Sequence, residues 1–98
     1  MKLTFHRLVQ REVNEAVRWY EEQSSGLGDD FFTKLTVALD SVVARPEAHG
    51  LWLGSKTVRR VKLKRFPYAV LYEIRPDRIR VLCVRHDKRH PSYGVGRK

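Results

Sequence analysis

The sequence predicts an α+β fold: a strand, a helical hairpin and a three-stranded antiparallel meander, with both helices on one face of the sheet. Three observations predict it. Apolar residues recur at three- and four-residue steps in the first half of the chain, and at alternate positions in segments of the second half. The connections between the last strands are short, which implies antiparallel neighbours. At 98 residues the chain forms one domain, residues 1–98.

The first half contains a strand and two helices. Residues 2–6 alternate apolar and polar side chains, which predicts a short strand. A helix is predicted from residue 8 to about 23, with its buried stripe at Val9, Val13, Ala16, Val17 and Tyr20. Residues 24–28, Ser-Ser-Gly-Leu-Gly, predict the turn that ends it. A second helix begins at Asp29 and Asp30, whose carboxylates favour a helix N-terminus, and ends before Pro46.

The second half predicts three strands, at residues 58–64, 68–75 and 78–85, with a turn at Pro76-Asp77 between the last two. Residues 47–56 form a loop in which Leu51, Trp52 and Leu53 pack against the core. The tail, residues 86–98, is polar and irregular. Because the helices cover one face of the sheet, the opposite face is expected to be open to solvent or to a ligand.

Positive charge is concentrated in the second half. Residues 1–50 hold six Lys/Arg against eight Asp/Glu, whereas residues 51–98 hold 14 against three, and the whole chain carries +9. Arg60, Lys62 and Lys64 alternate with Val61 and Leu63, so these three cations share one face of a strand. We expect that face to bind a polyanion or an acidic protein segment, although most surface charges are simply solvated.

Several classes of protein are excluded. A lone cysteine, Cys83, allows no internal disulfide and indicates a reducing compartment. The longest apolar run, residues 68–72, is too short to span a membrane, and the N-terminus lacks a secretory signal, so a cytoplasmic protein is expected. Cys83, His86 and His90 lack a fourth ligand for structural zinc, so no metal or other cofactor is expected. Cys83 lies in an apolar run and is interpreted as a buried residue.

Four segments, in order, resemble the RelE/ParE superfamily of toxins from type II toxin–antitoxin modules. They are residues 16–23 (AVRWYEEQ), 26–31 (GLGDDF), 59–68 (RRVKLKRFPY) and 81–93 (VLCVRHDKRHPSY). The resemblance covers nearly the whole chain. It implies a toxin that is neutralised by a cognate antitoxin and that arrests growth, with a toxin dimer as one arrangement within the complex.

The superfamily has two activities. RelE-like members cleave messenger RNA, often on the ribosome, and ParE-like members inhibit DNA gyrase without being nucleases. We predict a metal-independent messenger RNA endoribonuclease, whose partners are RNA or the ribosome. The alternatives are a non-enzymatic gyrase inhibitor and a degenerate toxin that binds only its antitoxin.

Metal-free RNA cleavage requires proton transfer and cations beside the phosphate. The resemblance implies that His86 transfers the proton, that Lys62 and Arg89 hold the phosphate, and that Tyr93 stacks on a base. The further RNA-binding residues are predicted to be Arg60, Lys64, Arg65, Arg85 and Lys88.

Other observations favour the alternatives. Ala69 stands where RelE itself has an arginine after the tyrosine of its central strand, so one phosphate-binding cation is missing. His86 could instead bond a backbone carbonyl at a strand end. Trp19 and Tyr20 are consecutive in a helix and cannot both face the core. A partly exposed Trp19 would suit contact with an antitoxin or a second copy of the chain.

Overall fold

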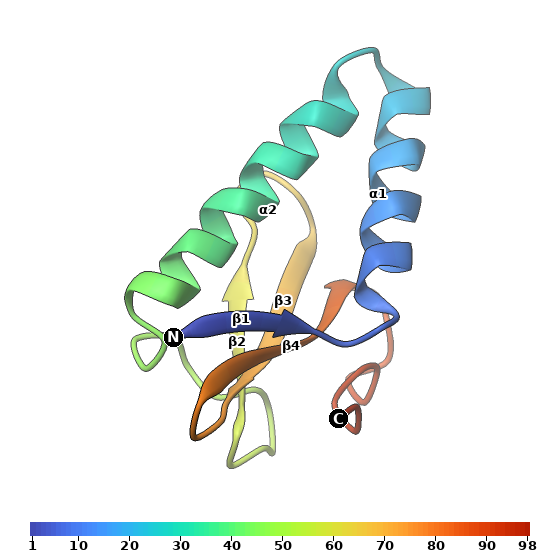
Figure 1. The fold of residues 1–98 in the computed structure, drawn as a ribbon. Coiled ribbons are helices and arrows are strands. Elements are labelled where there is room, and N and C mark those ends of the chain that lie inside the picture. Colours follow the sequence, from blue (N-terminus) through green and yellow to red (C-terminus); the bar gives the residue numbers. More distant parts are fainter.

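The computed structural model describes residues 1–98 and confirms the α+β architecture (Figure 1). The elements are β1 (Lys2–Phe5), α1 (Val9–Gln23), α2 (Leu27–Ala44), β2 (Val58–Lys62), β3 (Tyr68–Ile74) and β4 (Arg78–His86). The strands form one sheet in the order β1-β4-β3-β2, in which β1 runs parallel to β4 and the other neighbours are antiparallel. The sheet is therefore mixed, because the N-terminal strand returns to pair beside the last one.

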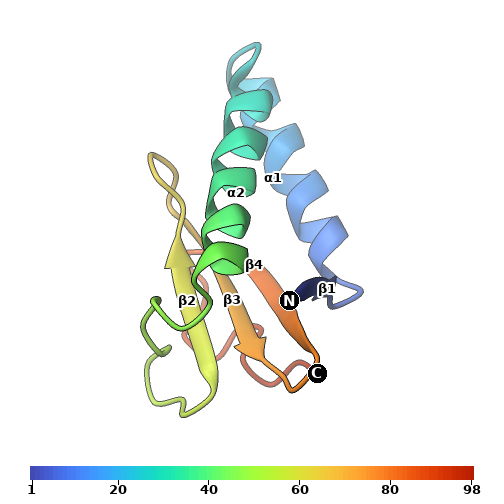
Figure 2. The ribbon, with the colours of Figure 1, turned by 60° about the vertical axis from the view of Figure 1, so that its left-hand side comes forward.

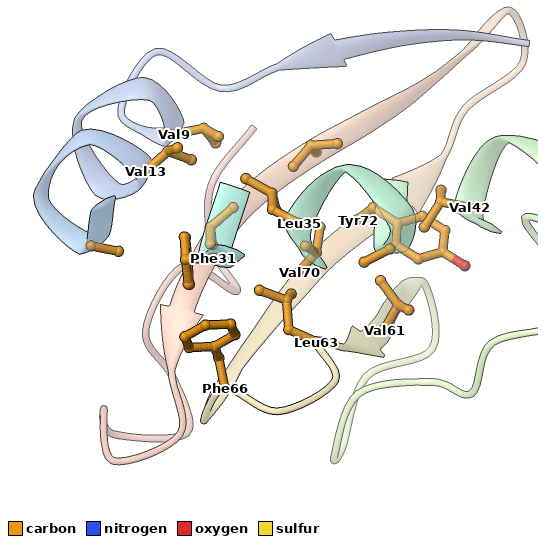
Figure 3. Packing of buried hydrophobic residues seen from close by; sticks show 14 of the residues in the cluster. Val9, Val13, Phe31, Leu35, Val42, Val61, Leu63, Phe66, Val70 and Tyr72 are labelled. Atoms are coloured by element: carbon orange, nitrogen blue, oxygen red, sulfur yellow. The ribbon is translucent and has the colours of Figure 1, made fainter. Parts of the chain in front are cut away.

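Both helices lie on one side of the sheet, with α1 over β4 and α2 over β2 (Figure 2). We call this side of the sheet the helix face and the opposite side the tail face. On the helix face, buried apolar residues from both helices meet those of the strands, as Figure 3 shows for Phe31, Leu35, Val70 and Tyr72. Burial of this apolar surface is the main force that holds the hairpin on the sheet.

The hairpin between α1 and α2 depends on Glu21 and Gly28. The Glu21 carboxylate accepts hydrogen bonds from the backbone N–H groups of Gly26 and Gly28, at 3.0–3.1 Å, and so caps the start of α2. A Cβ on Gly28 would lie 2.7 Å from the Val17 carbonyl oxygen, so the helices can approach this closely only at a glycine. Because Glu21 satisfies these backbone N–H groups, α2 begins at Leu27, two residues before the predicted start.

A β-bulge in β4 determines which side chains face the helices. Leu71 pairs with Cys83, but Tyr72 pairs with Val81, so Leu82 is the extra residue. Val81 and Val84 consequently both join the core on the helix face, whereas Leu82 and Cys83 belong to a second apolar cluster with Val58 and Leu71.

The expectation of an open face opposite the helices is correct at Arg60 and Lys62, which are exposed, but wrong where the second cluster lies. Trp52, Tyr93 and Val95 pack against it, so the loop before β2 and the tail (residues 87–98) cover the tail face. Of the predicted apolar loop residues only Trp52 packs in this way, because Leu51 and Leu53 are exposed.

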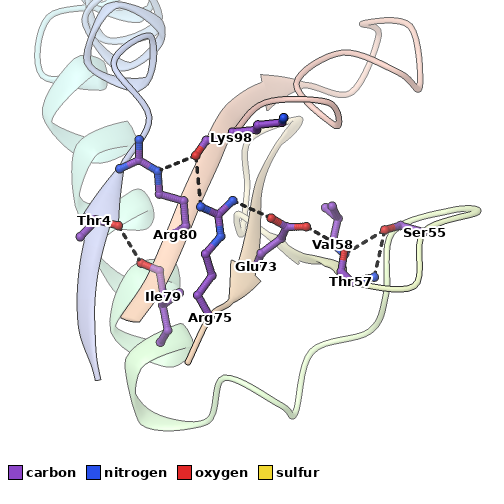
Figure 4. Close-up of polar contacts among 9 residues, drawn as sticks. All are labelled: Thr4, Ser55, Thr57, Val58, Glu73, Arg75, Ile79, Arg80 and Lys98. Carbon is purple, nitrogen blue, oxygen red and sulfur yellow. Dashed lines mark hydrogen bonds and ion pairs between the residues drawn. The ribbon is translucent and has the colours of Figure 1, made fainter. Parts of the chain in front are cut away.

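The tail also reaches the β3–β4 hairpin, as Figure 4 shows. The backbone carbonyl of Lys98 accepts hydrogen bonds from Arg75 and Arg80, at 3.2 and 3.3 Å. Arg75 also pairs with Glu73 at 2.8 Å, and Glu73 accepts a second bond from Thr57 at 2.7 Å. These arginines are thus engaged within the protein.

Neither α1 nor α2 combines the length and the apolar character that a membrane-spanning helix needs.

Candidate functional site

The predicted site residues gather at the end of the sheet where β2 and β4 finish and β3 starts. The sheet divides them into two groups. Arg60 and Lys62 pair with Leu71 and Ala69, and Ala69 pairs with Arg85, so these three cations share the tail face. His86 pairs with Tyr68, whose side chain packs against the helix-face core.

On the tail face, Arg85 is an internal structural residue. It is only 3% exposed. Its two terminal nitrogens donate to the backbone carbonyls of Arg89, His90, Pro91 and Tyr93, at 2.7–3.3 Å. The guanidinium also lies 4.8 Å from the centre of the Trp52 ring. The prediction that Arg85 binds RNA therefore finds no support, because its terminal nitrogens already hold the tail on the sheet.

The other cations at this end of the sheet are exposed, although some have partners. Lys62 forms an ion pair with Asp87, Arg65 pairs with Asp30 at 3.2 Å, and Arg60 lies 5.7 Å from the Trp52 ring centre. Lys64 and Lys88 make no ion pair. Pairs this exposed are easily exchanged for contacts with a partner. These five residues define the cationic end of the sheet.

A pocket of about 190 Å³ lies between α1 and the end of β4, and residues from both faces of the sheet line it. It brings together three of the four predicted catalytic residues: His86, Arg89 and Tyr93. Its other lining residues include Trp19, which is 57% exposed as expected, Tyr68 and the buried Arg85. Lys62 is not among them.

Within this pocket His86 is held in place. Its Nδ1 accepts the backbone N–H of Lys88 at 3.0 Å, and its ring packs edge-on to Tyr68, with centroids 5.1 Å apart. The guanidinium of Arg89 lies 4.7 Å from the centre of the Tyr93 ring and has no carboxylate partner. His86 and Arg89 thus keep free donor groups.

Tyr93 is engaged within the protein. Its hydroxyl donates to Glu12 Oε2 at 2.6 Å, and its ring lies between Arg89 and Arg97, whose guanidinium carbons are 4.7 and 5.0 Å from the ring centre. Burial, reinforced by the bond to Glu12, raises the pKa of Tyr93. A base could stack on this ring only if one of the arginines moved.

Most of the chain matches a known protein family. The sequence profile described as "ParE toxin of type II toxin-antitoxin system, parDE" matches residues 3–91. The chain belongs to the ParE toxin family. No curated protein matches it.

A solved structure titled "Chromosomal ParDE TA system from P. aeruginosa" is similar in fold to this ParE-family chain. The TM-score is 0.67 with 14% sequence identity, over 88% of this chain and 95% of that chain. At this identity the likeness concerns the fold. It supports the strand, helical hairpin and meander of the ParE fold.

Two residues of this ParE-family chain that sequence reasoning missed are Glu12 and Arg97. Glu12 Oε1 accepts the backbone N–H of Val84 at 3.0 Å, and Arg97 donates to Glu12 Oε2 at 2.8 Å and to the Leu82 carbonyl at 3.2 Å. They supply hydrogen-bond partners to the β4 backbone at Leu82 and Val84, beyond the last residue of β4 that pairs with β1. No spacing in the sequence connects them, because they belong to α1 and the tail.

Gly94 is predicted to be essential for the tail of this ParE-family chain. Its φ is +80°, and an added Cβ would lie 2.3 Å from Cys83 Sγ. Gly94→Ala should therefore lower the free energy of unfolding by about 2–3 kcal/mol through overpacking and backbone strain. Gly96→Ala is the control, since an added Cβ there meets nothing within 4 Å. Equal urea midpoints for the two variants would contradict the prediction.

Cys83 is predicted to be inert in the folded protein. Burial, with the nearby charge of Glu12, raises the pKa of this thiol to about 12. The structure also contains no group of three or more His, Cys, Asp or Glu side chains able to hold a metal. Burial disfavours the thiolate in the folded chain, so the thiol ionises more easily in the unfolded chain. The stability of the fold is therefore unaffected below the unfolded pKa of about 8.5 and decreases as the pH rises from there toward 12.

The measurement is reaction of Cys83 with a disulfide reagent at about pH 8, near the ordinary thiol pKa. Modification should follow unfolding, and its rate should rise with urea. Fast reaction of the native protein would show that the tail does not seal this cysteine.

Proposed function

We propose that this chain is the toxin subunit of a type II toxin–antitoxin module, pairs with a ParD-type antitoxin, and arrests growth by binding DNA gyrase rather than by cleaving RNA. The observation that carries the choice is the division of the predicted catalytic residues by the sheet. Lys62 lies on the tail face and outside the pocket, whereas His86, Arg89 and Tyr93 line the pocket beside α1. Membership of the ParE family supports the same choice.

The chemistry of RNA cleavage makes this division important. An in-line attack by the 2′-hydroxyl needs a base, an acid and cations around one phosphate. In this chain Tyr93 donates to Glu12, and Lys62 lies outside the pocket. Only His86 and Arg89 then remain for a phosphate bound in the pocket. One proton-transfer group and one cation make a weak ribonuclease.

The cationic end of the sheet is the proposed contact surface for the gyrase–DNA complex. Its residues, Arg60, Lys62, Lys64, Arg65 and Lys88, are all exposed. Cations arranged in this way attract DNA or an acidic protein surface and make binding sensitive to salt. Arg85 is left out of this surface because it is buried.

The nuclease remains the second candidate because His86, Arg89 and Tyr93 line one pocket. If Glu15, which also lines it, served as the base, His86 could protonate the leaving oxygen. This alternative predicts that His86→Ala abolishes toxicity.

Two assays of the purified protein distinguish the candidates. Gyrase should fail to supercoil relaxed plasmid when the protein is present, and messenger RNA in a translating extract should stay intact. His86→Ala should inhibit gyrase as well as the wild type does, whereas Lys64→Glu combined with Lys88→Glu should weaken inhibition at least about tenfold. Lys2→Glu combined with Lys56→Glu, at exposed sites on β1 and in the loop before β2, is the charge-matched control.

Shortened messenger RNA with normal supercoiling would overturn the proposal in favour of the nuclease. If neither assay changed, the chain would be a degenerate toxin that binds only its antitoxin.

A further inference from the structure

The pocket between α1 and the end of β4 contains hydrogen-bond donors that lack acceptors. Trp19, Tyr68, His86 and Arg89 line it. The Trp19 indole N–H, the Tyr68 hydroxyl, His86 Nε2 and the Arg89 guanidinium donate to no protein acceptor and face solvent, since no buried side-chain nitrogen or oxygen lacks a partner; His86 Nδ1 accepts the Lys88 N–H. Groups of this kind bind an acceptor from outside, and an anionic acceptor binds a guanidinium most strongly.

The acidic residues of the pocket do not supply that acceptor. Both oxygens of Glu12 are already bonded, to the Val84 N–H and to Tyr93 and Arg97. Glu15 lies at the rim with its side chain 64% exposed, and its nearest cation is Arg11 at 4.0 Å. The pocket thus has one neutralised carboxylate, one solvated carboxylate, the guanidinium of Arg85 bonded to the tail, and the guanidinium of Arg89 without a protein acceptor.

One cation acts directly on the pocket. Burial raises the pKa of Tyr68, Tyr20 and Glu15 act in the same direction, and the positive charge of Arg89 opposes them. Arg89 is therefore the cation that an anionic ligand beside the Tyr68 hydroxyl would meet.

The size of the pocket limits its ligand. Its volume of about 190 Å³ is below the roughly 300–1,000 Å³ of sites that enclose a small molecule. A single side chain fits this volume better than a nucleotide does. The exposed ring of Trp19 offers an apolar wall for the methylene groups of such a side chain.

We propose that this pocket binds a carboxylate side chain, Asp or Glu, from an acidic segment of the antitoxin. The carboxylate accepts hydrogen bonds from Arg89, Tyr68 and His86, and Trp19 covers its aliphatic part. This inference rests on the proposed pairing with an antitoxin. It does not require that gyrase is the target.

The test uses short blocked peptides that share one Ser/Leu framework and carry glutamate, glutamine or lysine. Binding to the full-length toxin is measured by NMR from the Trp19 indole and Tyr68 ring signals. The glutamate peptide should bind, and both the glutamine and the lysine peptides should bind at least about tenfold more weakly, the loss expected for one charge-assisted hydrogen bond.

Two variants of the pocket determine the sign of the ligand charge. Arg89→Gln should weaken binding of the glutamate peptide about tenfold, whereas Glu15→Gln should strengthen it by relieving repulsion. Lys88→Gln is the control, because Lys88 is an exposed neighbour outside the pocket lining. Amide spectra confirm that each variant is folded.

Three results would overturn the inference: stronger binding of the lysine peptide, equal binding of the glutamate and glutamine peptides, or binding of a ribodinucleoside monophosphate in preference to all three. The last result would assign the pocket to nucleic acid. Because the supercoiling assay uses toxin without peptide, a failure of the pocket inference and a failure of the gyrase proposal are separate observations.

Discussion

Replacing Arg85 with alanine should detach the tail and lower the free energy of unfolding by about 3 kcal/mol or more. The guanidinium donates to four tail carbonyls, those of Arg89, His90, Pro91 and Tyr93, and lies 4.8 Å from the Trp52 ring centre. A hydrogen bond to a charged group is worth about 1.5–3 kcal/mol, and a buried carbonyl that loses its donor has a further cost. The total loss of stability stays below the sum of these energies because the carbonyls of a detached tail form hydrogen bonds with water.

The measurements are urea unfolding and amide hydrogen exchange. Protection should fall in the tail and at Cys83, while the amides of β1 and both helices keep most of theirs. Arg85→Lys should rescue little, because one ammonium group cannot reproduce a planar fork that spans several carbonyls. Arg89→Ala removes an exposed guanidinium from the same region and should change stability by less than about 0.5 kcal/mol. Similar losses for Arg85→Ala and Arg89→Ala would contradict the structural role.

Much of the fold could be predicted because its signals are local. The helical spacing of Val9, Val13 and Ala16 and the alternation in residues 60–64 each reflect contacts with a single neighbouring layer. The parallel pairing of β1 with β4 has no such signal, since it joins Lys2–Phe5 to Arg78–Val81 across the whole chain. The periodicity of a segment predicts that it is a strand, but it does not indicate which other strand lies beside it.

The site was predicted less well than the fold. The placement of Arg60 and Lys62 on the face away from the helices follows from strand parity. The burial of Arg85 does not follow from strand parity. It depends on hydrogen bonds to tail carbonyls, which every residue type carries. A polar tail resembles a disordered one in composition, and contacts with distant parts of the chain, such as the side chain–backbone bonds of Arg85 and Arg97, distinguish them here.

The tail connects the two faces of the sheet. Arg85 anchors it on the tail face, and Tyr93 and Arg97 anchor it to α1 through Glu12. Arg89 lies between these anchors, so its position beside the pocket depends on both. A substitution at either anchor should therefore weaken binding of the glutamate peptide as well as stability, whereas substitution of Lys88 should affect neither.

Replacing Glu12 with alanine should have a comparably large effect, lowering the free energy of unfolding by about 3–5 kcal/mol. The side chains of Glu12 and Arg97 are only 9% and 14% exposed, so the change leaves a nearly buried guanidinium without its partner. The Val84 N–H and the Tyr93 hydroxyl lose their acceptor in the same step. Burial alone would lower the pKa of Arg97, but its bonds to Glu12 and Tyr93 raise it.

Glu15→Ala is the matched control, because this glutamate lies one turn further along α1, is 64% exposed and has its nearest cation 4.0 Å away. It should change stability by less than about 0.5 kcal/mol. Adding Arg97→Met to Glu12→Ala should recover part of the loss, because the orphaned charge is then removed. Urea unfolding at low and high salt measures each difference. If Glu12→Ala cost no more than Glu15→Ala, or if salt alone abolished the difference, the contact would be an ordinary surface pair that does not hold the tail.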